Sequence, residues 1–463
     1  MKIENHFIDF IPEEERHGSV RNLFSIWFSA NMHILTIVTG ALAIVFGLNL
    51  FWAVVSILLG NLIGAIFMAT HSVQGPNLGI PQMIQSRAQF GIIGAIIPLL
   101  IVVIMYIGFF ASNAVVSAQA LSSASSIPIN IGIALICITG FMIALYGYDL
   151  IHIIVKYLTI AFTAVFFFVT IAAFGLDLPA GSWSPSEFKL APFLLGVSVF
   201  AAWQLLYAPY VADYSRYLPS KTPSSKTFFY TYTGTVIGTV WMMVLGAVLA
   251  TAIPKFLDNP GKEVSHLLGP IFVPIIYAII IMGLAAINGL NLYGAFMSIT
   301  TIIETFTKLK GTIQTRFWLM LSCLILCGGL AIWGNGDFLN NFTNLILFLS
   351  YFMFPWTAIN LIDYYFLKKG HYNVTALFDL NGQYGKINWI ALGAYIIAIL
   401  LEIPFINSSF YVGPLVDNLG GTDLAWIVGL IVPVLLYYYP MKKLKSKSIS
   451  NELDVNEQLT TRI

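Results

Sequence analysis

The chain has 463 residues, of which 58% are hydrophobic and only 9% are charged. A soluble domain carries about 25% charged residues, so this composition excludes an ordinary water-soluble fold and favours a protein embedded in a lipid bilayer. The net charge of +1 provides no global field that would attract nucleic acid. The three cysteines, Cys137, Cys323 and Cys327, fall inside apolar runs, where neither a disulfide framework nor a zinc site is expected.

Apolar runs of about 20 residues follow one another along the chain, and each is long enough to cross a bilayer. They predict about twelve membrane spans, at residues 24–48, 50–72, 92–121, 128–146, 151–175, 191–213, 228–253, 270–303, 316–334, 339–366, 388–407 and 424–440. The predicted fold class is therefore an all-α integral membrane protein. Residues 1–22 and 441–463 are predicted to be polar terminal segments, the second of which is basic and suited to contact lipid headgroups.

The distribution of basic residues predicts the orientation of the chain. With both termini in the cytoplasm, most of the 22 basic residues fall in inner segments, and the outer loops contain only Lys189, Lys255 and Lys262. Cytoplasmic loops of membrane proteins carry this excess of Lys and Arg. We therefore expect a multi-pass protein of the cell membrane with both termini in the cytoplasm and no cleaved signal peptide.

Polar residues lie at mid-depth in the first predicted span, FSIWFSANMHILTIVTG. Asn31 and His33 stand between Ala30 and Ile34, where an interrupted helix would expose backbone groups to a solute or an ion. Intramembrane polar residues often mark a transport pathway. The alternative is that these residues bond within their own helix or serve helix packing.

The third span places an aromatic ring and an amide on one helical face, because Phe109 and Asn113 are four residues apart. A ring can stack on a flat heterocycle, and an Asn amide offers a donor and an acceptor to its edge. The pair therefore predicts a binding site for a nucleobase-like solute. The alternative is that Phe109 packs and Asn113 bonds a neighbouring helix.

The sixth span predicts a second interrupted helix. Gln204 and Tyr207 supply polar groups directly before Pro209, which removes a helical hydrogen-bond donor. Two interrupted helices, one opening each five-helix half, are typical of transporters built from inverted repeats with a site at the membrane midplane. Proline kinks without such a role are also common.

The eighth span contains two amides, Asn288 and Asn291, beside glycines that allow close approach of a ligand. Both are candidates for solute binding. Lys156 lies near the inner end of the fifth span, where its side chain could reach the cytoplasm.

At these segments the chain resembles the purine-cytosine permease-like members of the nucleobase-cation symporter family. The matching stretches include WFSANMHILTIVTGALA at 27–43, GPNLGIPQMIQSRAQFGIIG at 75–94, GFFASNAVVSAQAL at 108–121, YAPYVADYSRYLP at 207–219, NGLNLYGAFMS at 288–298 and PWTAINLIDYYFLKKGHY at 355–372. The resemblance implies a LeuT-type fold, with inverted repeats at 23–175 and 191–366 and two additional helices at 388–440. It further implies alternating access with cation coupling.

The resemblance also implies roles for particular residues. It assigns solute contacts to Phe109, Asn113, Trp203, Gln204, Tyr207 and Asn288. Sodium-coupled relatives have two hydroxyl residues just before the eighth-helix amide, which join carbonyls of the broken first helix around the ion, whereas this chain has Ala285, Ala286 and Ile287 there. We therefore expect proton coupling in preference to sodium, with Lys156 as a candidate to occupy the vacant charge position.

The sequence thus predicts a symporter for cytosine, a purine or a similar ring. The same architecture carrying allantoin, a hydantoin or a pyrimidine vitamin precursor remains an alternative, as does sodium coupling. No motif of a membrane enzyme or of a channel filter is present in the sequence. We expect no cofactor, no bound metal and no obligatory protein partner.

Overall fold

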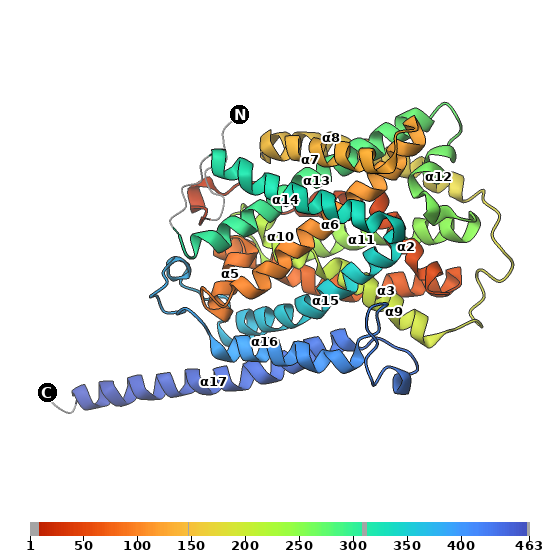
Figure 1. The fold of residues 1–463 in the computed structure, drawn as a ribbon. Coiled ribbons are helices and arrows are strands. Elements are labelled where there is room, and N and C mark those ends of the chain that lie inside the picture. The colour runs from red at the N-terminus through yellow and green to blue at the C-terminus, as the bar shows by residue number, and fades with distance from the viewer. Residues whose placement is uncertain (1–8, 147, 308–312, 461–463) are drawn as a thin grey trace.

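The computed structural model describes residues 9–146, 148–307 and 313–460, with residues 146, 148–159, 313 and 445–460 described by their backbone alone (Figure 1). Within these ranges the chain folds into helices that run largely alongside one another (Figure 1). In a bilayer this is the expected solution, because each helix satisfies its own backbone hydrogen bonds.

The long helices correspond one to one with the predicted spans. They are α1 with α2 (Asn22–Ser29 and Ile34–Val45), α3 (Leu50–Ser72), α6 (Ile96–Ser125), α7 (Ile129–Tyr146), α8 (Tyr148–Ala173), α9 with α10 (Leu190–Leu205 and Ala208–Ser215), α11 (Ser224–Ala252), α13 (Val273–Glu304), α14 (Ile313–Gly334), α15 (Phe338–Ile362), α16 (Trp389–Glu402) and α17 (Ala425–Thr460). Short helices α4 (Gln74–Leu78), α5 (Gln82–Phe90) and α12 (Pro260–His266) connect them. The prediction of an all-α membrane protein is confirmed.

Several of the predicted boundaries differ from the structure by a few residues or more. The third span was expected from residue 92, but α6 begins at Ile96, because the backbone N–H groups of Ile92 and Ile93 donate to the carbonyls of Gly385 and Lys386. The last helix was expected to end near residue 440, whereas α17 continues to Thr460 and includes most of the basic tail.

The first span is interrupted where the sequence predicted. α1 ends at Ser29 and α2 begins at Ile34, and the helix axis turns by 62° between them. His33 has extended backbone torsion angles (φ −150°, ψ 162°) and therefore ends the run of helical hydrogen bonds. The interruption between α9 and α10 is milder, because Leu206 and Tyr207 keep right-handed helical torsion angles and Pro209 opens the first turn of α10.

The packing between helices relates the two halves of the chain. The broken first helix of one half packs on α11, the second helix of the other half, while α9 and α10 pack on α3. The third helices of the two halves, α6 and α13, pack against each other along much of their length. This exchange of equivalent contacts is what an inverted five-plus-five repeat produces, with α16 and α17 added outside it.

Glycines allow the closest of these contacts. A Cβ added at Gly40 of α2 would clash with the backbone of Met243 in α11, and one at Gly246 of α11 would clash with the carbonyl of Ile37 in α2. Gly64 of α3 meets the backbone of Ala201 in α9 in the same way. Small residues at such positions let helix backbones approach each other in membranes.

The N-terminal segment lies across one end of the bundle. The N–H of Ile11 donates to the carbonyl of Gly79, and the N–H of His17 donates to the carbonyl of Tyr217. Glu13 accepts hydrogen bonds from the N–H of Ser220, which together with nearby Arg16 lowers the pKa of its carboxyl. These contacts tie the chain start to the loops that follow α4 and α10.

Candidate functional site

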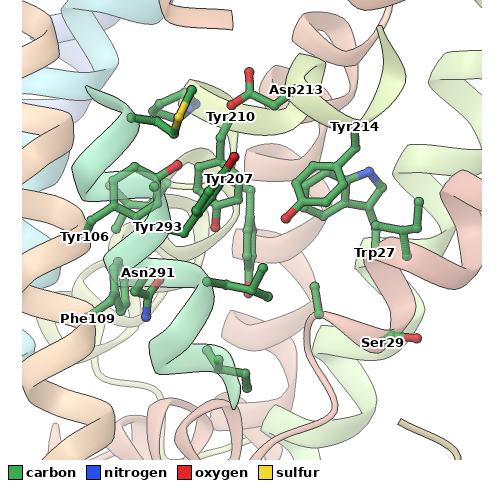
Figure 2. Close-up of a pocket in the computed structure, with 18 of the residues that line it drawn as sticks. Trp27, Ser29, Tyr106, Phe109, Tyr207, Tyr210, Asp213, Tyr214, Asn291 and Tyr293 are labelled. Atoms are coloured by element: carbon green, nitrogen blue, oxygen red, sulfur yellow. The ribbon is translucent and has the colours of Figure 1, made fainter. Parts of the chain in front are cut away.

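A large cavity of about 970 Å³ lies between the two interrupted helices and the paired helices α6 and α13 (Figure 2). Its wall at the mouth includes His17, Ser19 and Tyr217, so it opens at the end that carries the N-terminal segment. Its other limit lies near His33, in the break between α1 and α2, and near Asn113, about midway along α6. A concave, mostly apolar site with a few polar groups is the usual form of a small-molecule pocket.

Three rings form the deep end of this cavity. The rings of Phe109 and Trp203 lie 5.8 Å apart between centroids and are nearly perpendicular, at 86°. The imidazole of His33 lies 6.2 Å from the Trp203 ring. All three residues line the cavity, so the structure brings together the aromatic candidates from the first, third and sixth spans.

Two amides line the same cavity. Asn113 is 2% exposed, and its Oδ1 has no hydrogen-bond partner among the described residues. Asn291 of α13 also lines the cavity, and Figure 2 draws it close to Phe109. An unpaired amide oxygen beside aromatic rings can accept a hydrogen bond from the edge of a flat heterocycle.

The structure separates Asn288 from this group. Asn288 is fully buried and its side chain lies against Gly140 of α7. Neither amide atom has a hydrogen-bond partner among the described residues, and Asn288 is not part of the cavity wall. The two amides of the eighth span thus face different surroundings.

Asn31, in the break between α1 and α2, forms hydrogen bonds with residues of the sixth span. Its Oδ1 accepts hydrogen bonds from the indole N–H of Trp203 at 3.1 Å and from the hydroxyl of Tyr207 at 3.0 Å. Its amide nitrogen donates to the carbonyl of Trp27 at 2.9 Å and to the hydroxyl of Thr235 at 3.3 Å. Asn31 therefore orients the two aromatic residues and has no capacity left for a solute.

Gln204 also serves contacts between helices. Its amide nitrogen donates to Asn61 Oδ1 and to the hydroxyl of Thr239, both at 2.9 Å, and its oxygen accepts a hydrogen bond of 2.6 Å from Thr235. The side chain is fully buried and lies outside the cavity wall. The structure thus places Gln204 in a polar network among α3, α9 and α11.

The segment suggested for an ion supplies few oxygen ligands. Ala30 lines the cavity at the end of α1, whereas Ile34 is buried at the start of α2 and does not. Ala286 of α13 lines the cavity as well, but it brings no side-chain oxygen. A hard cation needs about six oxygen ligands, so these residues alone do not complete such a site.

The two remaining candidates from the sequence are Pro209 and Lys156. Pro209 lies in the first turn of α10 and lines the cavity. Lys156 lies in α8, but its side chain is outside the described residues.

A further group of aromatic residues, which the sequence did not favour as solute contacts, lies between the deep end and the mouth. They are Trp27, Tyr106, Tyr210, Tyr214 and Tyr293, all of which line the cavity (Figure 2). A signal for some of them was present, because Trp203, Tyr207, Tyr210 and Tyr214 recur at helical spacing. Such a stripe alone does not distinguish a cavity wall from a packed core.

Comparison with known proteins agrees with this architecture. A family model described as permease for cytosine/purines, uracil, thiamine, allantoin matches residues 10–429. A Bacillus subtilis protein named "Putative purine-cytosine permease YxlA" is 54% identical over 452 residues, which cover 97% of this chain and 98% of that protein. The purine-cytosine permease FCY2 of Saccharomyces cerevisiae is 30% identical over 81% of this chain and 73% of its own length.

Solved structures of the transporter Mhp1 share the fold. The inward-facing form of Mhp1 superposes with a TM-score of 0.76 and 17% identity, over 96% of this chain and 95% of Mhp1. A closed form with bromovinylhydantoin bound, described as a nucleobase-cation-symport-1 family transporter, gives a TM-score of 0.75 and 16% identity over 96% of each chain.

Proposed function

Because the chain belongs to the family of permeases for cytosine/purines, uracil, thiamine and allantoin, and is thus a membrane transporter and not an enzyme, we propose that it imports a nucleobase by cation-coupled symport. The proposed solute is cytosine or a purine-like base. The observation that carries this proposal is the deep end of the cavity, where the rings of Phe109 and Trp203 meet the amides of Asn113 and Asn291.

Each part of this site matches one property of a nucleobase. The flat ring stacks on an aromatic face, a contact worth about 1–3 kcal/mol per base. The edge of the base carries N–H and C=O groups, which an amide can pair with both as donor and as acceptor. Tyr207 acts indirectly, since its hydroxyl bonds Asn31 and fixes the wall beside Trp203. We do not extend the proposal to Gln204, whose hydrogen-bonding groups are used within the bundle.

We propose proton coupling. The absence of side-chain oxygens at Ala285 and Ala286 supports this choice over sodium. His33 at the first break and Lys156 in α8 are the candidates for the titrating group. A solute and an ion that both favour one state of the transporter would couple by shifting its conformational equilibrium.

The basic residues support an orientation with both termini in the cytoplasm. The guanidinium of Arg16 donates to the Pro76 carbonyl, that of Arg216 to the Asp9 carbonyl and that of Arg87 to the Leu377 carbonyl. These residues lie in the N-terminal segment or in the segments between the long helices. The contacts of the N-terminal segment with the loops after α4 and α10 place Arg16 and Arg216 at the same end. In this orientation the cavity opens to the cytoplasm, and the protein resides in the cell membrane.

Uptake into proteoliposomes tests the proposal. Purified protein should accumulate radiolabelled cytosine or a purine above the external concentration when an inward proton gradient is imposed, with saturation at high solute. An imposed sodium gradient should not drive accumulation. Accumulation driven by sodium alone would overturn the choice of ion, and saturable uptake of allantoin, a hydantoin or a vitamin precursor without uptake of any base would overturn the choice of solute.

A further inference from the structure

The cavity is much larger than one nucleobase requires. Its volume of about 970 Å³ is at the upper end of the range of about 300–1,000 Å³ that accommodates drug-sized ligands. The four side chains of the proposed base site occupy only its deep end. The remaining space extends to the mouth beside His17 and Tyr217.

The middle of the cavity is walled by a second set of aromatic residues, which we call the vestibular rings. They are Trp27, Tyr106, Tyr207, Tyr210, Tyr214 and Tyr293. They come from four helices, α1, α6, α10 with its N-terminal flank, and α13 (Figure 2). Since no single helix supplies them, the tertiary fold gathers them around the passage.

Tyr210 is central among the vestibular rings. Its ring centroid lies 5.6 Å from that of Tyr106, 5.9 Å from that of Tyr207 and 6.2 Å from that of Trp27. Tyr214 lies 5.3 Å from Trp27 and continues the group towards the mouth. Tyr207 also lies 6.2 Å from Trp203, so the vestibular rings are continuous with the deep site.

Polar atoms accompany the rings. Among the described residues, no hydrogen bond engages the hydroxyls of Tyr106 and Tyr210, although both residues line the cavity. The carboxylate of Asp213 also lines it and accepts the N–H of Gln82 at 2.8 Å. Aromatic faces with hydroxyls and a carboxylate nearby offer stacking together with donors and acceptors for a second flat, N–H-bearing ring.

We propose that the vestibular rings form a second binding site for the same planar heterocycle, which the solute occupies on its way between the deep site and the mouth. The proposal rests on the proposed function, because it takes the solute to be a nucleobase. The occupant is expected to be the transported solute itself, because the vestibular rings adjoin the deep site and any solute that moves between that site and the mouth must pass them. Base stacking on aromatic side chains tolerates different rings, so this site should be weaker and less selective than the deep one.

Equilibrium dialysis of the purified full-length chain with a radiolabelled nucleobase tests the proposal. The native protein should bind two molecules per chain, the second at least about tenfold more weakly than the first. Asn113→Ala should remove the tight event and retain the weak one. Tyr210→Leu should weaken the weak event about tenfold and leave the tight one within about twofold of the native value.

Two further variants serve as a repeat of this test and as its control. Tyr106→Leu repeats the test from another helix in case Tyr210→Leu fails to fold. Tyr439→Leu is the matched control, because Tyr439 is 63% exposed on α17 and outside the cavity. A single bound molecule at saturation, or two sites that are both unaffected by Tyr210→Leu and Tyr106→Leu, would overturn the second site alone. Binding of no base at all would overturn the proposed function as well.

Discussion

At the scale of single residues, the intramembrane amides differ in whether the protein already satisfies them. Asn31 and Gln204 use their amide groups in hydrogen bonds between helices. Asn113 and Asn288 retain amide atoms that have no partner among the described residues. Since a buried polar atom without a partner costs about 1–3 kcal/mol, an unsatisfied amide beside a cavity is a better candidate for solute binding than a satisfied one.

Replacing Gln204 should therefore affect stability and not affinity. In Gln204→Leu the oxygen of Asn61 and the hydroxyls of Thr235 and Thr239 lose a partner, and we expect the free energy of unfolding to fall by about 1–3 kcal/mol. Thermal unfolding and base dialysis on the same sample measure the two effects. Loss of base binding at unchanged thermal stability would instead assign Gln204 to the solute.

Replacing Asn288 should not lower the stability of the protein, in contrast to replacing Gln204. Because both of its amide atoms lack partners among the described residues, Asn288→Leu should leave the unfolding temperature unchanged or raise it. Base affinity should stay within about twofold of the native value, whereas Asn291→Leu should weaken it at least about tenfold. If the Asn288 variant lost binding and the Asn291 variant did not, the two assignments would have to be exchanged.

The deep site could be predicted only in part from the sequence. The spacing of Phe109 and Asn113 was sufficient to predict that the two side chains lie on one face of their helix, because residues four apart share a helical face. The choice between Asn288 and Asn291 was not, since residues three apart share much of one helical face and only helix packing decides which of them lines the cavity. Hydropathy likewise gave no indication that Gln204 would find three partners on α3 and α11.

At the scale of elements, the two interruptions were predictable and α5 was not. Polar residues at mid-depth and Pro209 signalled the breaks. The sequence of α5, QMIQSRAQF, is polar enough to suggest an exposed loop, yet every residue in it is buried. The reason is a set of specific bonds, such as that from the Gln89 amide to the Asp363 carboxylate, which composition cannot reveal.

The glycine contacts between α2 and α11 allow a test of the helix pairing. Gly246→Ala should disrupt it, because the added methyl group meets the Ile37 carbonyl, and we expect a lower unfolding temperature and loss of uptake. Gly329→Ala in α14 is the matched control, since an added Cβ meets no atom within 4 Å there. Normal stability of the Gly246 variant would show that the two helices do not approach as described.

At the scale of the whole molecule, the cavity opens at the end of the described structure that carries the N-terminal segment. Its lining residues at the mouth belong to the N-terminal segment and to the end of α10. With the proposed orientation this is an inward-open state. Transport would then require a second state in which the deep site communicates with the other side.

Labelling of introduced cysteines tests this orientation, because Cys137, Cys323 and Cys327 are all buried. Ser298→Cys places a thiol on the cavity wall, so a membrane-impermeant maleimide should react with it from the cytoplasmic face, and a bound base should slow the reaction. Ser186→Cys, in the exposed loop between α8 and α9, should react only from the outside. The reverse pattern for the two variants would invert the orientation.

The central claim is that a nucleobase binds between the rings and the amides of the deep site, and ligand-induced thermal stabilisation of the purified protein tests it most directly. A base at 100 times its Kd should stabilise the native protein by about 2.7 kcal/mol, because it binds the folded state alone. Asn113→Ala and Asn291→Ala should each remove this contribution of the deep site and leave only the smaller contribution of the weaker vestibular site, while the ligand-free proteins unfold at the native temperature. Full stabilisation by the same base in both variants would contradict the claim.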